Sequence, residues 1–354
     1  MTVGPSPLRV GLLGYGLAGS VFHAPLIATC PGLRLDAVVT SDAERQARVL
    51  RDHPRARALD RAEQVWAMAA DLDLVVVATP NRFHVPLALA AIEVGLAVVV
   101  DKPFAPTAAE GHRLLAEARR RGVPITVFQN RRWDGDYLTV RRLLDEGALG
   151  RVSRFESRFE RWRPSVGDGW RESGAAGEAG GALYDLGAHL IDQALQLFGP
   201  PTSVYAELDR RRPRAEVDDD AFVALTHASG TRSHLWISAV APQLGPRMRV
   251  LGDRAGYTKY GLDVQEDALA GGARPGVDGW GEEPPERWGW AGVDGDLRQV
   301  RTERGRYEEF YAGVASALRE GGPMPVDPAD SIAVLEIIEA ARSSASSGRA
   351  FPVR

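Results

Sequence analysis

Three ionisable side chains lie in sequence contexts that could hold them at a reacting centre. Lys102 follows an apolar run and precedes Pro103 in the segment AVVVDKPF. Proline disfavours helical backbone for the residue before it, so Lys102 is expected to stay extended where a buried strand ends. Asp185 and His189 are four residues apart in LYDLGAHLIDQALQLFG, which places both on one face of a regular helix. An ammonium, a carboxylate and an imidazole are groups that transfer protons or stabilise developing charge.

Each of these residues also has an ordinary explanation. A lysine at a strand end is commonly solvated, and the helix could be amphipathic, with Asp185, His189 and the glutamines at 193 and 196 facing water. The strand before Lys102, however, is apolar enough to be central in a parallel sheet, which exposes only its ends. The segment before Asp185 is rich in glycine, which suits backbone that approaches a ligand closely. These glycines are Gly174, Gly177, Gly180 and Gly181.

The elements that must position these side chains follow from the periodicity of residues 8–130. Short apolar runs, typical of strands, alternate with helical patterns, and helices are predicted over residues 86–95 and 107–122. Apolar strands separated by helices imply a doubly wound parallel sheet, whose ligands bind outside the carboxyl ends of the strands. Strands are predicted over residues 8–14, 33–40, 73–79, 96–102 and 124–130.

A glycine-rich turn directly follows the first predicted strand. Gly14, Gly16 and Gly19 have the G-x-G-x-x-G spacing of a dinucleotide-binding loop. In that loop the first glycine permits a tight turn, the second lets the backbone approach a pyrophosphate, and the third lets the helix pack closely on the strand. Tyr15 and Leu17 lie between these glycines and are expected to contact the coenzyme with them. The motif alone is weak, but at the start of a strand–helix–strand unit it favours dinucleotide binding.

The end of the second predicted strand bears on the choice of coenzyme. Enzymes that use NAD commonly have an acidic residue there, which binds the ribose 2′-hydroxyl. Here the strand ends in Thr40 and Ser41, and a small hydroxyl leaves room for a 2′-phosphate. Arg45 and Arg48 follow on the next helix, where they could also be ordinary solvated charges. The sequence favours NADP, with Ser41 and Arg45 as contacts, while Asp42 keeps NAD possible.

Residues 131–354 have a different pattern. Several segments alternate in polarity with period two, which predicts a mostly antiparallel open sheet with one face solvated or packed on a partner. The Gly-, Pro- and Trp-rich residues 271–296 are predicted to be a long ordered loop, and residues 209–220 (DRRRPRAEVDDD) a solvated connection. A last helix is predicted over residues 329–348. We expect a Rossmann dinucleotide-binding domain over residues 1–130, and an α/β domain for substrate and oligomerisation over residues 131–354.

The overall composition argues against several other classes of protein. The chain has 354 residues and a net charge of −4, which gives no electrostatic reason to expect nucleic acid or an anionic membrane as a partner. No apolar run approaches the length of a transmembrane helix, and the first residues lack the pattern of a secretory signal. Cys30 is the only cysteine, so a reducing compartment, the cytoplasm, is expected. No metal site is expected.

With these residues in view, nearly the full chain resembles the Gfo/Idh/MocA family of NAD(P)-dependent oxidoreductases. Within that family it most resembles the subgroup that contains NADP-dependent scyllo-inositol dehydrogenase. The resemblance implies an N-terminal Rossmann domain and a second α/β domain whose large open sheet commonly forms homodimers or homotetramers. It rests on several motifs together, namely GYGLAGSVFHAPLI, ATPNRFH, VVVDKPF, FQNRRWD, WRESG, LYDLGAHLIDQALQLFG and KYGLDVQED.

The resemblance also implies roles for individual residues. The family's E-K-P lysine falls on Lys102, with Asp101 in place of the more frequent glutamate. Its D-x-x-x-H pair falls on Asp185 and His189. Further coenzyme contacts are implied in a loop over the nicotinamide ribose and in a W-R pair of the second domain. These residues are Thr79, Pro80, Asn81, His84, Trp170 and Arg171.

The reaction that this resemblance implies is a reversible hydride transfer between nicotinamide and a secondary alcohol or ketone of a neutral cyclic polyol or sugar. A lysine with the ordinary pKa of about 10.4 would cost about 4–5 kcal/mol to hold neutral at pH 7, whereas a histidine near 6.5 costs almost nothing. We expect His189 to take the proton, Lys102 to stay charged and stabilise the alkoxide, and Asp185 to orient the hydroxyl or Lys102. These roles reverse if burial strongly depresses the lysine pKa.

Two other functions stay open in the same fold. One is a glycosidase that uses nicotinamide transiently and returns the hydride at the end of the cycle. The other is a non-catalytic sensor that binds a dinucleotide and a partner protein. A sensor can dispense with catalytic side chains, so the joint presence of Lys102, Asp185 and His189 argues against it.

Overall fold

The computed structural model describes residues 6–167, 169–175 and 177–353. Within these ranges no helix combines the length and the apolar character needed to span a bilayer. The chain divides into two compact units, each discontinuous in sequence. The first contains the residues up to Asn130 with Gln265–Trp280 and Arg306–Ile332, and the second contains Arg131–Val264, Gly281–Gly305 and the residues from Ala333 onward.

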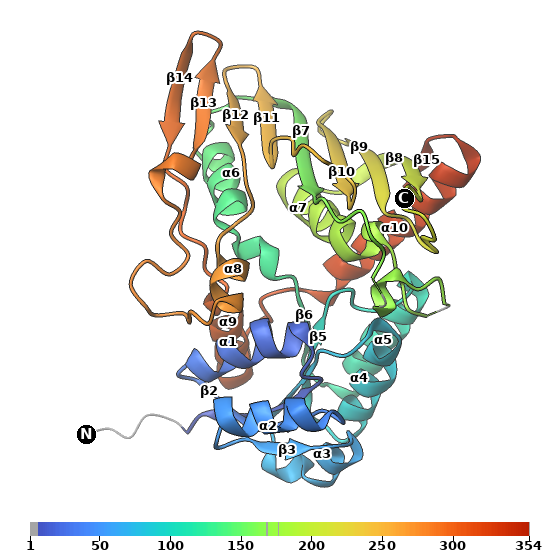
Figure 1. Cartoon of the computed structure of the whole chain (residues 1–354), viewed down its shortest axis with the longest axis vertical. Coiled ribbons are helices and arrows are strands. Elements are labelled where there is room, and N and C mark those ends of the chain that lie inside the picture. The colour runs from blue at the N-terminus through green and yellow to red at the C-terminus, as the bar shows by residue number, and fades with distance from the viewer. Residues whose placement is uncertain (1–5, 168, 176, 354) are drawn as a thin grey trace. The chain divides into compact units, whose positions relative to one another are not determined.

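The described part of the first unit contains a sheet of six parallel strands (Figure 1). They are β1 (Leu8–Leu13), β2 (Leu33–Val39), β3 (Arg57–Leu59), β4 (Leu74–Val77), β5 (Ala97–Asp101) and β6 (Ile125–Phe128). Their order, β3-β2-β1-β4-β5-β6, confirms the predicted Rossmann sheet, and it reverses between β1 and β4, where such sheets bind ligands. The short edge strand β3 is one that the sequence pattern does not reveal.

Helices join these strands. The helices predicted over residues 86–95 and 107–122 are confirmed as α4 and α5. Thr107 caps α5 by accepting the backbone N–H of Glu110, and Gly122 ends it with a left-handed φ of +65°. The first helical segment begins with a π-helical turn, Ala18–His23, before α1. The helices are α1 (Ala24–Thr29), α2 (Ala43–Asp52), α3 (Glu63–Ala67), α4 (His84–Glu93) and α5 (Ala108–Arg121).

Two segments from far along the chain, carrying α8 (Gln265–Ala270) and α9 (Glu308–Glu320), complete the first unit. The Phe128 ring at the end of β6 packs edge-on against Phe310 of α9, with 4.9 Å between centroids. Burial raises the pKa of Tyr311, and its hydroxyl forms a hydrogen bond of 2.6 Å with Nδ1 of His23. The buried core of the Rossmann sheet therefore depends on residues beyond position 300.

The part of the second unit that the structure describes forms a nine-stranded sheet, whose strands are labelled β7 to β15 in Figure 1. Its strands are β7 (Val152–Glu160), β8 (Pro201–Asp209), β9 (Asp220–His227), β10 (Arg232–Ser238), β11 (Met248–Gly252), β12 (Gly256–Lys259), β13 (Gly289–Val293), β14 (Asp296–Val300) and β15 (Phe351–Pro352). The order is β14-β13-β12-β11-β7-β10-β9-β8-β15, and only the β7–β10 pair is parallel. The predicted mostly antiparallel sheet is thus confirmed.

The two faces of this sheet differ, as the period-two pattern predicts. In β9 the side chains of Ala221, Val223 and Leu225 are buried, and those between them are partly exposed. The buried face packs on helices α6 (Gly135–Asp145), α7 (Ala188–Phe198) and α10 (Pro328–Ser347), the last of which confirms the helix predicted over residues 329–348. The opposite face carries an aromatic cluster, in which Phe222 lies 5.2 Å from Trp236 between ring centroids.

The prediction of a long loop over residues 271–296 is wrong in its last third. This segment contains β13, which pairs with β12 and β14. Its glycines serve the pairing, because a side chain at Gly289 would overlap the Tyr257 ring at 2.5 Å. Glycine is typical of a loop in the sequence, but here Gly289 makes room for the Tyr257 side chain of the neighbouring strand.

Candidate active site

The glycine loop follows β1 at the carboxyl end of the sheet. Gly14 has a φ of +98°, and a side chain there would overlap the Ala78 carbonyl. A side chain at Gly19 would overlap the Gly14 carbonyl, so this glycine lets the helix approach the strand as predicted. Gly16 instead borders open space, because a side-chain carbon at this position would meet no atom closer than Nη1 of Arg45, at 3.9 Å. Leu17 is 60% exposed.

Tyr15, the residue between the first two glycines, is buried beneath Arg48 of α2. The Arg48 guanidinium lies 5.0 Å from the centre of the Tyr15 ring, and its Nη2 donates to the Tyr15 carbonyl at 3.5 Å. Nε of Arg48 is buried and has no hydrogen-bond partner within the described residues. A guanidinium beside a glycine loop, with a donor still unused, is suited to an anionic ligand.

The residues directly after β2 differ in exposure and in hydrogen bonding. Ser41 is exposed, and Asp42 caps α2 by accepting the backbone N–H of Arg45 at 2.9 Å. Nε of Arg45 lies 3.7 Å from the Asp42 carboxylate, and both side chains are about half exposed. The carboxylate that kept NAD possible is therefore engaged at the start of α2.

The turn that carries Lys102 is joined to the loop after β4. The ring nitrogens of His84 lie 2.8 Å from the Pro103 carbonyl and 2.9 Å from the Thr79 carbonyl. Burial, the largest influence, lowers the pKa of His84. The Asp101 carboxylate accepts the backbone N–H of Lys102 at 2.9 Å. The structure thus brings together four of the predicted residues at one edge of the sheet, namely Thr79, His84, Asp101 and Lys102.

The surroundings of these residues contain both charge and an unused hydroxyl. Burial by itself would raise the pKa of Asp101, but the adjacent His23, with His84 and Lys102, brings it below its usual value. Oγ1 of Thr79 is buried without a hydrogen-bond partner in the residues that the structure describes. Pro80 follows, and Asn81 is 3% exposed at the start of a 3₁₀ turn.

Asp185 and His189 do not lie on one regular helix, which corrects the expectation from their spacing. Asp185 belongs to a π-helical turn, Leu183–Gly187, and His189 to α7. The Asp185 side chain is 29% exposed, whereas His189 is 5% exposed with its ring 6.5 Å from that of Phe159. A π-helical turn is a frequent feature of functional sites, and the glycine loop of the first unit also leads into one.

The alternative of a water-facing stripe fails at His189 and Gln193, which are buried, although Gln196 is exposed. Gln193, one turn after His189, is fully buried. Its amide nitrogen donates to the Arg131 carbonyl at 2.9 Å, and its oxygen accepts from Arg247 at 3.0 Å. Gln193 is therefore held by buried hydrogen bonds and does not face water.

The predicted pair Trp170 and Arg171 lies on a 3₁₀ turn, Trp170–Glu172. The Arg171 guanidinium lies 4.4 Å from the centre of the Trp170 ring, and its Nε donates to the Asp185 carboxylate at 3.3 Å. A side chain at Gly180 would lie 2.5 Å from the Ser173 carbonyl, so this glycine serves close backbone packing within the chain. The structure thus brings Trp170, Arg171 and Asp185 together.

Residues 209–220 are a solvated connection only in part, because three of their charged side chains are buried. Arg212 has a side chain only 4% exposed, and it pairs with Glu172 and with Asp219, which is fully buried. Asp218 accepts the backbone N–H of Leu183 at 2.7 Å. These residues hold the turns of Arg171 and Asp185, and nothing in the charge run itself distinguishes them from the exposed arginines around them.

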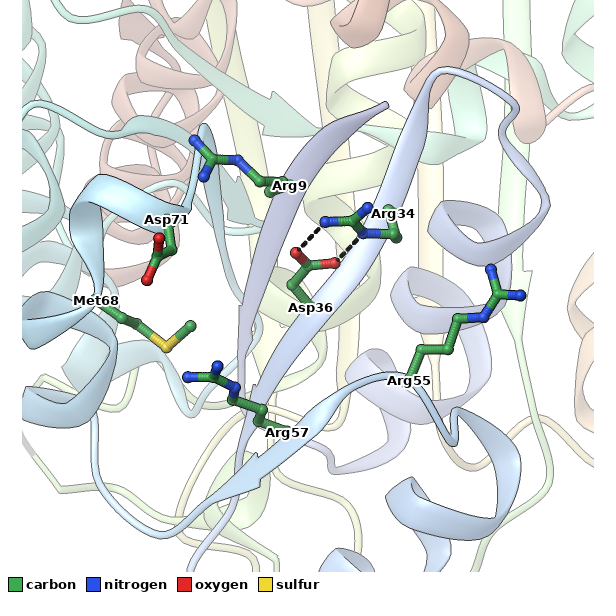
Figure 2. Close-up of a pocket in the computed structure, with 7 residues that line it drawn as sticks. All are labelled: Arg9, Arg34, Asp36, Arg55, Arg57, Met68 and Asp71. Carbon is green, nitrogen blue, oxygen red and sulfur yellow. Dashed lines mark hydrogen bonds and ion pairs between the residues drawn. The ribbon is translucent and has the colours of Figure 1, made fainter. Parts of the chain in front are cut away.

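A separate pocket of about 450 Å³ lies at the amino ends of β1, β2 and β3 and contains none of the predicted residues. Figure 2 shows its arginines, of which Arg34 pairs with Asp36 at 2.6 Å. Arg55 and Arg57 extend in different directions, and among the residues that the structure describes no nucleophilic side chain or histidine lines the pocket. It lies at the opposite strand ends from those that carry the glycine loop and Lys102.

The predicted catalytic residues belong to different units. Lys102 lies in the first unit, and Asp185 and His189 lie in the second. The expectation that Lys102 and His189 act on the same substrate carbon stays a prediction.

Comparison with known proteins gives the family. Residues 8–129 match an oxidoreductase family with an NAD-binding Rossmann fold, and residues 137–258 match the GFO/IDH/MocA C-terminal domain. The chain is 38% identical to scyllo-inositol 2-dehydrogenase (NADP(+)) IolW of Bacillus subtilis, covering 97% of this chain and 95% of that protein. It is 41% identical to the uncharacterized oxidoreductase YdgJ of Escherichia coli, over 96% of each.

Solved structures agree. A putative oxidoreductase from Bacillus subtilis has a TM-score of 0.91 at 36% identity, covering 99% of this chain and 98% of that one. A putative oxidoreductase from Yersinia pestis has the same TM-score at 39% identity, covering 98% of this chain and 97% of that one. The family models match both domains, and the relatives cover nearly the full length of the chain. The chain belongs to the Gfo/Idh/MocA family of oxidoreductases.

Proposed function

We propose that this chain is an NADP-preferring dehydrogenase that transfers a hydride between nicotinamide and a secondary alcohol or ketone of a cyclic polyol or sugar. The Bacillus subtilis relative, whose name gives scyllo-inositol and NADP(+), supports the substrate class and the coenzyme. The observation that carries the proposal is the group of functional residues at the ends of β1, β4 and β5. There the glycine loop, Thr79 and Lys102 all follow the carboxyl ends of parallel strands.

The residues of the first unit fit a dinucleotide. The open space beside Gly16 lets the backbone approach a pyrophosphate, and the buried Thr79 hydroxyl has a donor to offer a ribose. Bound nicotinamide supplies or accepts the hydride. The protein's own task is to orient the coenzyme and to handle the proton of the substrate hydroxyl.

The choice of NADP is supported by three residues of α2 and its cap. Asp42 is engaged as the N-cap, while Arg45 and Arg48 approach the glycine loop. Arginine pairs well with phosphate because its planar fork presents parallel donors. We infer that Arg45 and Arg48 recognise the 2′-phosphate. Arg48 thereby joins Ser41 and Arg45, the two contacts that the sequence predicted here.

Coenzyme affinity tests this choice. Arg48→Gln is expected to weaken NADPH binding about 10–100-fold while changing NADH binding little, because one charge-assisted contact is lost. Arg51→Gln is the matched control, because Arg51 lies on the same helix with a side chain 71% exposed. Equal affinity of the unmodified protein for NADH and NADPH would contradict the proposed preference.

His189 is the proposed proton acceptor, Lys102 the stabiliser of the developing alkoxide and Asp185 the group that orients the hydroxyl or Lys102. His189→Asn is expected to lower kcat about 10²–10⁴-fold and to remove the limb of the pH–rate profile that reports the base. Lys102→Met is expected to lower kcat about 10²–10³-fold and to keep that limb. His112→Asn, an exposed histidine of α5, is the control. If His189→Asn keeps a near-normal rate and profile, Lys102 is the base.

The reaction itself is tested by a panel of inositols, inososes and aldoses, assayed at about 340 nm with NAD and NADP in parallel. Net oxidation or reduction of the coenzyme with a polyol or its ketone supports a dehydrogenase. Cleavage of a glycoside without net coenzyme turnover would identify a redox-assisted glycosidase. Binding of the coenzyme with no reaction on any member would favour the non-catalytic sensor.

We also propose that a second copy of this chain covers the exposed face of the nine-stranded sheet, to give a homodimer or homotetramer. Phe222, His234 and Trp236 form an aromatic cluster there, and the Arg158 guanidinium lies 4.0 Å from the centre of the Trp236 ring. Aromatic residues and arginine are enriched at protein interfaces. Trp236→Glu is expected to shift the mass measured by light scattering toward that of a monomer, and an unmodified protein that is monomeric would contradict the proposal.

A further inference from the structure

Arg212, whose side chain is buried, joins two loops of the second unit through ion pairs. Its Nη1 and Nη2 donate to the two carboxylate oxygens of Glu172 at 3.1 and 2.7 Å, and its Nε donates to Asp219 at 2.9 Å. The backbone N–H groups of Arg211 and Arg212 donate to Asp219 as well, at 2.7 and 3.0 Å. One planar guanidinium thus satisfies two carboxylates that lie 47 positions apart in sequence, at 172 and 219.

The same loop holds the turn that carries Asp185. The Asp218 carboxylate accepts the backbone N–H of Leu183 at 2.7 Å, and its carbonyl accepts that of Ala182 at 2.8 Å. The Arg171 carbonyl in turn accepts the backbone N–H of Gly181 at 2.9 Å. Residues 212–219 therefore fix both backbone segments whose side chains meet in the Arg171–Asp185 contact of 3.3 Å.

Hydrophobic packing cannot fix these segments by itself. Between positions 171 and 181 the sequence reads RESGAAGEAGG, which contains no apolar side chain larger than alanine. Such a segment buries little apolar area, and its glycines make it costly to order. Ion pairs with defined geometry supply the missing constraint, because a bidentate pair fixes direction as well as distance.

We propose that Glu172, Arg212 and Asp219 form a positioning clamp that holds Arg171 in its contact with Asp185 and in place for the coenzyme. None of the three clamp residues touches a reacting atom; they act through Arg171. This inference rests on the proposed function together with the coenzyme contact that the family resemblance implies for Arg171. It assigns a task to a charged segment that the family motifs do not include.

A double-mutant cycle on NADPH affinity tests the clamp with the full chain. Glu172→Gln removes one charge but leaves Arg212 paired with Asp219, so the protein is expected to fold with its Tm changed by less than about 3 °C. Its Kd for NADPH is expected to rise about tenfold, as for Arg171→Met. The double variant is expected to bind no more weakly than Arg171→Met alone, because Glu172 acts through Arg171.

Arg211→Gln is the matched control, since Arg211 neighbours Arg212 but pairs with Asp209 and Asp220 through a side chain that is 58% exposed. Its Kd is expected to stay within twofold of the unmodified protein. A Tm that falls in Glu172→Gln with an unchanged Kd would show a purely structural role and overturn the inference. Additive losses in the double variant would overturn it as well.

The outcomes separate the clamp from the function on which it rests. If Arg171→Met leaves the Kd for NADPH unchanged, the role proposed for Arg171 toward the coenzyme is wrong, and the clamp falls with it. If Arg171→Met weakens binding but Glu172→Gln does not, the clamp alone is wrong. If the unmodified protein does not bind NADPH, the proposed coenzyme is wrong.

Discussion

Two clusters of arginine and aspartate in this protein have similar compositions and opposite environments. At the amino ends of β1, β2 and β4, Arg34 and Asp36 have side chains 45% and 19% exposed, and Arg9 and Asp73 are each 32% exposed. Between β8 and β9, the Arg212 side chain is 4% exposed and Asp219 is fully buried. Exposed ion pairs contribute about 0–1 kcal/mol, whereas breaking a buried pair costs several times more because one charge is left without a partner. The burial of its side chains therefore decides how much a cluster of charged residues contributes to the stability of the fold.

The largest expected effect is that of Arg212→Met. We expect the free energy of unfolding to fall by about 3–5 kcal/mol, since the Asp219 charge would remain buried without its guanidinium. Urea unfolding followed by circular dichroism measures this loss. Adding Asp219→Asn should restore part of it by removing the uncompensated charge. A loss below about 1 kcal/mol would show that the buried pair contributes no more to stability than the exposed pairs do.

An intermediate effect is expected for Asp219→Asn alone, and it depends on pH. Burial by itself would raise the pKa of Asp219, but the backbone N–H groups of Arg211 and Arg212 and the Arg212 guanidinium hold it below its usual value. A carboxylate whose folded pKa is depressed stabilises the fold above its ordinary pKa and loses that contribution as pH falls through the folded value. The variant should be less stable by about 1–3 kcal/mol at pH 7, and the difference should shrink below about pH 4. A difference that grows on acidification would contradict this assignment.

The smallest effect is expected at the exposed cluster. Arg34→Gln and Arg57→Gln should each change the free energy of unfolding by no more than about 0.5 kcal/mol. The Arg34 effect should weaken further in about 1 M salt, where exposed charges are screened within a few ångströms. A loss comparable to that of Arg212→Met would show that the pocket of Figure 2 is far more tightly organised than its exposure indicates.

The first unit could be predicted well from the sequence because its signals are local. The spacing of Gly14, Gly16 and Gly19 and the apolar run before Lys102 each describe a few consecutive residues, and the structure places them at the carboxyl ends of β1 and β5. The period-two pattern of the second unit likewise predicted its sheet. These features depend on backbone geometry that neighbouring residues determine.

The features that the sequence did not reveal depend on contacts between distant residues. The regular helix expected around Asp185 is a π-helical turn, whose first backbone N–H groups are held by Asp218. The burial of Arg212 requires Glu172 and Asp219 to approach from two loops. Composition cannot separate such an arginine from its exposed neighbours, because the distinction arises only when the segments pack together.

The return of α9 to the Rossmann sheet has a consequence for biosynthesis. During translation the six parallel strands leave the ribosome well before Phe310 and Tyr311, which complete the core around Phe128 and His23. The part of the core around Phe128 and His23 therefore stays incomplete until residues 310 and 311 have been made. Chaperone demand during synthesis should consequently be concentrated on the segment up to Phe128, which emerges first.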